Sequence, residues 1–302
     1  MNTAQLVTNA HAAGTVIPAF NIPYLPMMEP VVRALRDSRS AGLIMVARLE
    51  LFKFEAQSLA AVRDEYERVK DERFTRLHLD HVPVIDEDQQ RVDFIAMIRE
   101  AIELGYQSVM IDGSRLSLEE NIAATRDVMQ MAHEAGIPAE AELGAVMGHE
   151  DGPMPPYDEL FASGKGFTDI DDAARFVAET KTDWLSVAIG NVHGAISAAK
   201  KNQAKIRARL NIDHLDHIRQ TTKIPLVLHG GTGIANEDVR ESFRHGIAKI
   251  NIATAIRQVY ERTLPESLDQ ALEAVYQKTM LILRDDLDVV GSADTLGLAA
   301  QA

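Results

Sequence analysis

The chain has 302 residues, of which 46% are hydrophobic and 25% are charged, as is typical of a large globular domain. Its formal net charge of −14 would repel nucleic-acid phosphates, and the absence of cysteine excludes disulfides and thiolate metal sites. No apolar run is long enough to span a bilayer, and the first residues show no basic region followed by an apolar core. We therefore expect a cytoplasmic protein with no nucleic-acid or membrane partner.

Eight short apolar runs recur along the chain, each rich in Val, Ile, Leu and Ala. Amphipathic helical stretches lie between most of them, and strands that alternate with helices pair in parallel. Eight such units in about 250 residues predict one α/β domain over residues 1–302, a (β/α)8 TIM barrel. The runs are residues 16–20, 42–47, 76–82, 108–112, 138–145, 184–190, 225–229 and 249–254, and the clearest helical stretches are 92–104, 118–135 and 173–180.

A doubly wound open sheet is the alternative, because it also alternates strands with helices. It would require some apolar runs to be misassigned, and no Gly-x-Gly-x-x-Gly motif follows the first strand. The barrel is the better prediction. We expect C-terminal helices and a tail over residues 255–302, helical to about residue 288 and loosely ordered from residue 291.

The third predicted strand ends in His78-Leu79-Asp80-His81. The active site of a barrel lies at the C-terminal ends of its strands. On a regular strand Asp80 and His81 point to opposite faces, so both can serve one site only if the strand bends or ends there. In that case Asp80 lies beside a metal ligand, in a suitable position for a general base.

Histidines also end the sixth and seventh strand regions, at His193 and His229. Three neutral imidazoles with an open fourth position are what a catalytic zinc requires. A lone histidine at such a place is more often a buried structural side chain. Three at strand ends, two of them followed by glycine, favour a metal, so we predict that His81, His193 and His229 hold Zn²⁺.

Acidic side chains follow the same pattern in the fourth and fifth strands. Glu140 and Glu142 share one face of the fifth strand, and burying an unpaired carboxylate costs several kcal/mol. Two carboxylates that point into a barrel therefore indicate a cation. Asp112 ends the fourth strand and has the same character, although a single aspartate there could also be a helix N-cap.

A long irregular stretch, residues 144–166, follows the fifth strand and is rich in glycine and proline. Loops of this length inside a compact domain are usually lids or binding loops, so we expect an active-site loop that overhangs the metal. Glu150 lies within it. The simplest interpretation of Glu150 is a solvated loop charge, and the alternative is a lid carboxylate that swings inward.

The last two strands carry the signature of an anion site. Residues 230–233, Gly-Gly-Thr-Gly, follow the seventh strand, and residues 251–254, Asn-Ile-Ala-Thr, end the eighth. Barrels frequently hold phosphate in these two loops.

Lys249 starts the eighth strand and so lies at the wrong end for a Schiff base. Residues 213–217 repeat the histidine pattern at helical spacing, and we assign them to a helix surface.

Five of these motifs occur in the order and spacing of one known family. The chain resembles the class II zinc-dependent aldolases of ketose bisphosphates, which act on fructose 1,6-bisphosphate or tagatose 1,6-bisphosphate. Residues 16–22 look like the first strand of that family, and the resemblance runs from about Gly14 to about Arg257. The motifs are residues 78–81, 140–144, 190–194, 229–233 and 251–254.

The resemblance implies a role for each candidate at the metal. Asp80 would move the proton of the ketose, and Glu142 would be an alternative or second-site metal ligand with Asp112 nearby. Glu150 would be the lid carboxylate that assists proton exchange. The implied zinc ligands are His81, His193 and His229.

The resemblance also implies a site for dihydroxyacetone phosphate, the enediolate half of the cleaved ketose, and a monovalent cation, Na⁺ or K⁺, on nearby carbonyls. The expected activity is a lyase reaction of carbohydrate metabolism, carried out by a homodimer or homotetramer. The implied substrate- and phosphate-binding residues are Asn21, Gly194, Gly230, Gly231, Thr232, Gly233, Asn251, Ala253 and Thr254.

Three other functions remain open from the sequence. The same metal-enolate chemistry could act on a different anionic aldehyde or a sugar-acid phosphate. A zinc-dependent barrel hydrolase would also gather histidines at strand ends, but it would not need the phosphate loops. A non-catalytic partner subunit could keep the fold, although the intact Asp80 and the three histidines argue against it.

The second strand departs from the resemblance. Where the family usually has a Gln-x-Ser-like pattern, with a serine that helps to hold the far phosphate of the aldehyde half, residues 46–51 read Val-Ala-Arg-Leu-Glu-Leu. Arg48 could pair with Glu50 or Glu55 at the barrel rim. The alternative is that Arg48 binds an anionic group on an aldehyde other than glyceraldehyde 3-phosphate, because a guanidinium can hold phosphate or carboxylate with two hydrogen bonds.

Overall fold

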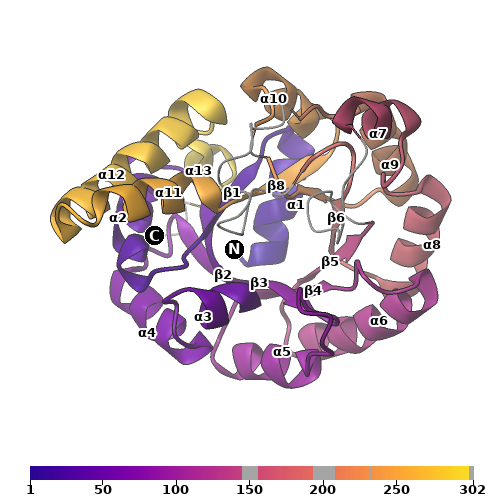
Figure 1. Cartoon of the computed structure of the whole chain (residues 1–302), viewed down its shortest axis with the longest axis horizontal. Coiled ribbons are helices and arrows are strands. Elements are labelled where there is room, and N and C mark those ends of the chain that lie inside the picture. The colour runs from indigo at the N-terminus through magenta and orange to yellow at the C-terminus, as the bar shows by residue number, and fades with distance from the viewer. Residues whose placement is uncertain (145–155, 193–207, 232, 299–302) are drawn as a thin grey trace.

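Eight parallel strands close into a barrel in the computed structural model, which describes residues 1–144, 156–192, 208–231 and 233–298 (Figure 1). Each strand pairs with the next along the chain, and β8 returns to pair with β1. The predicted TIM barrel is therefore confirmed over the open sheet. The strands are β1 (Ile17–Asn21), β2 (Gly42–Ala47), β3 (Thr75–Pro83), β4 (Ser108–Asp112), β5 (Ala139–Leu143), β6 (Trp184–Val187), β7 (Leu226–Leu228) and β8 (Ile247–Ile252).

Helices surround the strands and cover their outer faces (Figure 1), which is why the strands are buried on both faces. Within the described ranges, no helix has the length and apolar character needed to cross a membrane. The helical elements are α1 (Thr3–Ala13), η1 (Leu25–Met27), α2 (Met28–Asp37), α3 (Arg48–Lys53), α4 (Leu59–Val69), α5 (Phe94–Glu103), α6 (Leu118–Glu134), α7 (Tyr157–Ser163), α8 (Ile170–Thr180), α9 (Ile212–Thr222), α10 (Asn236–Arg244), α11 (Thr254–Thr263), α12 (Leu268–Leu281), η3 (Ile282–Asp286) and α13 (Ser292–Thr295).

The chain begins at the end of the barrel where the strands start. Figure 1 shows α1 within the outline of the barrel, and Arg76 near the start of β3 donates a hydrogen bond to the Met1 carbonyl at 2.9 Å. This leaves the opposite end, where the strands finish, for the candidate site.

The bend that the site requires lies in β3. The register between β3 and β4 shifts between Leu79 and Val82, and His81 has a φ of +26°. A bulge of this kind inserts an extra residue and re-aims the side chains beside it. Asp80 and His81 can therefore both face the barrel mouth, which resolves the conflict between strand alternation and a shared site.

Three segments differ from the expectation. Residues 157–163 form α7, so residues 144–166 are not irregular throughout. Strand β6 ends at Val187 rather than near residue 190, because the chain turns at Gly190, where φ is +107° and a Cβ would lie 2.5 Å from the Arg209 carbonyl oxygen.

The third difference is the C-terminal segment 291–298, for which the expected loose order is wrong. The Gly291 and Ala293 amides donate to the Ser38 and Arg39 carbonyls, both at 3.0 Å. The Arg39 guanidinium also binds both carboxylate oxygens of Asp294, at 2.7 and 2.6 Å. Apolar side chains of the segment are buried as well, so it is fixed against the loop between α2 and β2.

Candidate metal centre

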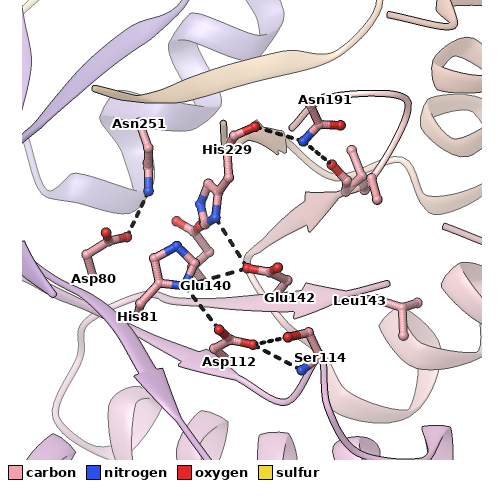
Figure 2. Close-up of polar contacts among 12 residues, drawn as sticks. Asp80, His81, Asp112, Ser114, Glu140, Glu142, Leu143, Asn191, His229 and Asn251 are labelled. Carbon is pink, nitrogen blue, oxygen red and sulfur yellow. Dashed lines mark hydrogen bonds and ion pairs between the residues drawn. The ribbon is translucent and has the colours of Figure 1, made fainter. Parts of the chain in front are cut away.

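Two imidazoles and two carboxylates meet at the carboxyl ends of four strands (Figure 2). The rings of His81 and His229 lie with their centroids 4.6 Å apart. His81 Nδ1 lies 3.1 Å from Asp112 Oδ2 and 3.7 Å from Glu142 Oε2. His229 Nδ1 lies 3.2 Å from the same Glu142 oxygen. Residues far apart in sequence are thus brought together as the barrel topology predicted.

This arrangement offers two overlapping groups of metal-binding atoms. Asp80, His81 and His229 form one group, and His81, Asp112 and Glu142 form the other, with ligand atoms within 4.8 Å of one another in each. Imidazole nitrogens and carboxylate oxygens are ligands that Zn²⁺ accepts. The donor set in the described part of the chain therefore fits a divalent cation, and His81 belongs to both groups.

The charged groups around His81 also favour a bound cation. Burial disfavours a charged imidazole, but the carboxylates of Asp80, Asp112 and Glu142 outweigh it and raise the pKa of His81 to about 10. Burial likewise opposes ionisation of Asp112, but the hydrogen bond with His81 outweighs it and holds the Asp112 pKa well below its usual range. The site therefore favours positive charge at this position, as a proton or as a metal ion.

Asp112 is fixed from its other side by Ser114, a residue that we did not predict. The Ser114 amide and hydroxyl both donate to Asp112 Oδ1, at 3.0 and 2.6 Å. The N-cap of α6 is Ser117, so the alternative of Asp112 as a helix N-cap is wrong. The Asp-x-Ser spacing is the signal that could have suggested this turn.

A cation does lie beside Glu140, as expected, and it is the ammonium group of Lys249. Its Oε2 lies 2.8 Å from Lys249 Nζ, and both side chains are fully buried. Burial alone would raise the Glu140 pKa, but Lys249 and the hydrogen bond with His229 outweigh it and lower that pKa to about 2. Glu140 Oε1 lies 2.8 Å from His229 Nε2, which orients that ring with Nδ1 toward Glu142.

We expect Lys249→Met to lower the free energy of unfolding by about 3–5 kcal/mol, because it leaves the Glu140 carboxylate buried without its ammonium partner. Urea denaturation measures the change. Lys53→Met is the matched control, since Lys53 pairs with Glu87 at the surface and such pairs contribute less than about 1 kcal/mol. Equal effects of the two substitutions would contradict a structural role for the buried pair.

Asp80 is held by two asparagines from the first and last strands. Asn21 Nδ2 donates to Asp80 Oδ2 and Asn251 Nδ2 donates to Asp80 Oδ1, both at 2.9 Å. Burial opposes ionisation of Asp80, but the positive charge of His81 and Lys249 outweighs it and holds the Asp80 pKa well below its usual range. An ionised, oriented carboxylate beside the imidazoles is suited to accept a proton.

Arg48 does not pair with Glu50 or Glu55, and those expected pairings are wrong. Its Nη1 lies 3.3 Å from Asp86 Oδ2, and its guanidinium lies 4.8 Å from the centre of the Phe52 ring. Asp86 lies in the segment between β3 and α5. The spacing of the strands along the sequence does not predict where the residues of such a connecting segment lie. Glu50 is instead buried beside Asn21, a contact that we did not predict.

The two loops predicted to bind phosphate begin where β7 and β8 end. Gly230 and Gly233 adopt positive φ angles of +67° and +92°, which explains glycine at both places. Ala253 precedes α11 and Thr254 is its first residue, so a helix N-terminus faces this end of the barrel. Four predicted site residues lie outside the described residues, namely Glu150, His193, Gly194 and Thr232.

The repeated histidine pattern lies in α9, as predicted. His217 is exposed, whereas His214 is half-buried and its Nε2 lies 2.7 Å from the Thr168 carbonyl oxygen. Neither belongs to the groups of candidate ligands found among the described residues.

Comparison with known proteins gives a consistent result. A family model described as fructose-bisphosphate aldolase class-II matches residues 1–295. The YdjI aldolase from Escherichia coli K12 is 25% identical, with a TM-score of 0.74 over 97% of this chain and 99% of that chain. A putative fructose-1,6-biphosphate aldolase from Coccidioides immitis is 25% identical, with a TM-score of 0.76 over 97% and 98%. The fructose-bisphosphate aldolase from Campylobacter jejuni, at 20% identity and a TM-score of 0.70 over 94% and 93%, shares the fold.

Proposed function

The chain belongs to the class II fructose-bisphosphate aldolase family and is an aldolase. We propose that it uses Zn²⁺ to cleave or form a carbon–carbon bond of a phosphorylated ketose. Dihydroxyacetone phosphate would be one product of cleavage. The observation that carries the proposal is the meeting of His81, His229 and Asp80 at the barrel mouth. His193 is the proposed third imidazole ligand.

Zinc, when bound, would act as a Lewis acid that stabilises the negative charge developing on the ketose oxygens. Asp80 takes the hydroxyl proton of the bond that is cleaved, or returns it in the condensation direction. Its two asparagine donors hold one carboxylate orientation throughout. Glu142 and Asp112 offer a second metal position, and Glu150 is proposed to assist proton exchange on dihydroxyacetone phosphate.

The loops after β7 and β8 are proposed to bind the phosphate, with a monovalent cation on their carbonyls. Glycines with positive φ follow His229, and α11 begins directly after β8, so backbone amides of both segments are available for an anion. A homodimer or homotetramer remains our proposal for the assembly. Family membership favours the aldolase over a barrel hydrolase or a non-catalytic subunit.

A retro-aldol assay combined with metal analysis tests this function. Purified protein should release dihydroxyacetone phosphate from at least one ketose phosphate and should contain about one divalent metal per chain. The panel should include fructose and tagatose 1,6-bisphosphates and ketose phosphates that end in a carboxylate. Release of inorganic phosphate alone, without carbon–carbon cleavage, would favour a hydrolase.

The substrate's far end is proposed to be an anionic group bound by Arg48. This side chain follows β2 and keeps 20% of its surface exposed beside the 67% exposed Phe52. A guanidinium has five donors, and its 3.3 Å contact with the Asp86 carboxylate leaves others for a ligand. Arg115 donates to the Asp86 carbonyl, so the acidic partner of Arg48 is itself held in place.

Arg48→Ala is expected to lower kcat/KM for an aldehyde with an anionic tail by roughly tenfold to a hundredfold, the contribution of one charge-assisted contact. Proton exchange on dihydroxyacetone phosphate alone should barely change. Lys53→Ala serves as the control, because Lys53 also lies in α3 but pairs with Glu87 and Asp88. If the Arg48 variant treats charged and uncharged aldehydes as the parent does, Arg48 is structural.

A further inference from the structure

One buried carboxyl group beside the site has no role in the reaction described above. Glu50 in α3 is 6% exposed, and among the described residues no ion pair joins it to a cation. Its Oε2 accepts hydrogen bonds from the Ala47 amide at 2.8 Å and from Asn21 Nδ2 at 3.2 Å. Burial, together with the nearby Asp80 carboxylate, raises the pKa of Glu50 to about 8.

The Asn21 amide connects Glu50 with Asp80. Its nitrogen carries two hydrogens, and it donates to Glu50 Oε2 at 3.2 Å and to Asp80 Oδ2 at 2.9 Å. Glu50 Oε2 already accepts from the Ala47 amide, and Asp80 is ionised, so a rotated Asn21 amide would place its oxygen against two acceptor oxygens. Glu50 therefore holds Asn21 in the one orientation that donates to Asp80.

The other donor to Asp80 is fixed in a comparable way. Lys249 Nζ donates to Asn251 Oδ1 at 2.7 Å, which leaves the Asn251 nitrogen for Asp80. Each of the two asparagines is thus oriented by a further buried polar group, Lys249 on one side and Glu50 on the other.

We infer that Glu50 is a positioning residue of the aldolase, which fixes the Asn21 amide and through it the carboxylate of Asp80. The inference rests on the proposed role of Asp80 in moving the proton. A misplacement of about 1 Å at a reacting group can cost on the order of a hundredfold in rate. Glu50 would then affect turnover without touching the substrate.

A purely local role for Glu50 is the alternative. Glu50 is the third residue of α3, and its bond to the Ala47 amide is half of a capping box. Glu120 has the same place in α6, where it forms a capping box with Ser117, but its side chain is exposed. Glu120→Leu is therefore a matched control, since it removes a capping glutamate far from Asp80.

The test compares Glu50→Leu, Glu50→Gln and Glu120→Leu with the parent protein. Glu50→Leu should lower kcat for ketose cleavage by roughly tenfold to a hundredfold while KM and metal content stay unchanged. Proton exchange on dihydroxyacetone phosphate should stay within about twofold. Glu50→Gln should keep most of the activity, because both bonds go to one oxygen that a carboxamide also supplies. Glu120→Leu should leave the ratio of cleavage to exchange unchanged.

A second measurement is independent of turnover. Nuclear magnetic resonance of ¹⁵N-labelled protein should show slow hydrogen exchange at the Asn21 side-chain amide in the parent and in Glu50→Gln, and fast exchange in Glu50→Leu. Unchanged Asn21 exchange in Glu50→Leu would overturn the inference even if the parent enzyme had no aldolase activity.

Two kinetic results would also overturn it. One is that Glu50→Leu loses cleavage and proton exchange to the same extent, and the other is that Glu50→Gln and Glu50→Leu lower kcat equally. A parent that cleaves no ketose phosphate would contradict the proposed function instead.

Discussion

Replacement of His81 or His229 by alanine is expected to remove the bound metal and lower kcat/KM for cleavage by roughly three orders of magnitude or more. A Lewis acid contributes several kcal/mol to the stabilisation of a transition state, and each 1.4 kcal/mol or so is tenfold in rate. Both rings lie in the candidate groups, and His81 belongs to both, so its loss leaves neither group intact. The same result is expected for His193.

Metal content measured by mass spectrometry, together with activity before and after chelation and after zinc is restored, checks this expectation. His214→Ala is the control, because His214 contacts the Thr168 carbonyl from α9 and should keep both metal and activity. Full activity in excess chelator with no metal detected would end the zinc proposal.

The same site should bind metal more tightly as the pH rises. Carboxylates outweigh burial and raise the pKa of His81 to about 10, so a metal that binds this ring must displace a proton below that pH. Apparent affinity of the metal-free protein should therefore increase from neutral pH toward about pH 10, and titration should release protons.

Asp80→Ala should separate proton transfer from metal binding. We expect it to retain zinc and bind dihydroxyacetone phosphate, yet to lower kcat by roughly two to four orders of magnitude, the usual contribution of a positioned acid–base group. The reason is that the Asp80 carboxylate is ionised and accepts hydrogen bonds from Asn21 and Asn251, which orient it.

Steady-state kinetics, metal content and binding of dihydroxyacetone phosphate together check this result. Asp80 also belongs to one candidate group of metal ligands, so the metal content of the variant decides between two roles. If metal is retained, Asp80 acts in proton transfer. If metal is lost in parallel with activity, Asp80 is a ligand and another group must move the proton.

Strand and helix periodicity was sufficient to predict the barrel, because each strand is buried on both faces and each helix has one apolar face. It also placed Asp112, Glu142 and His229 at the carboxyl ends of their strands, where they meet. Periodicity could not reveal the bulge at His81, since a bulge depends on the register with the neighbouring strand.

Two of the errors share one physical cause, which is that the contact partners lie far away in sequence. Arg48 was expected to pair with Glu50 or Glu55, but its partner Asp86 is brought to it from beyond β3. The cation expected beside Glu140 could not be identified from the sequence, because nothing in the fifth strand indicates that Lys249 lies opposite. Likewise, the segment 291–298 has few local signals of order and is fixed by residues near the start of the chain.

The two asparagines that hold Asp80 come from β1 and β8, the strands whose pairing closes the ring. They are also the strands most distant in sequence, so their pairing closes the longest loop of the barrel and has the largest loop-closure entropy cost. The carboxylate proposed to move the proton is therefore assembled only when the barrel is complete. A nascent or partly folded chain that has not docked β8 lacks one of the two donors, so enzymatic competence would arise together with closure of the ring.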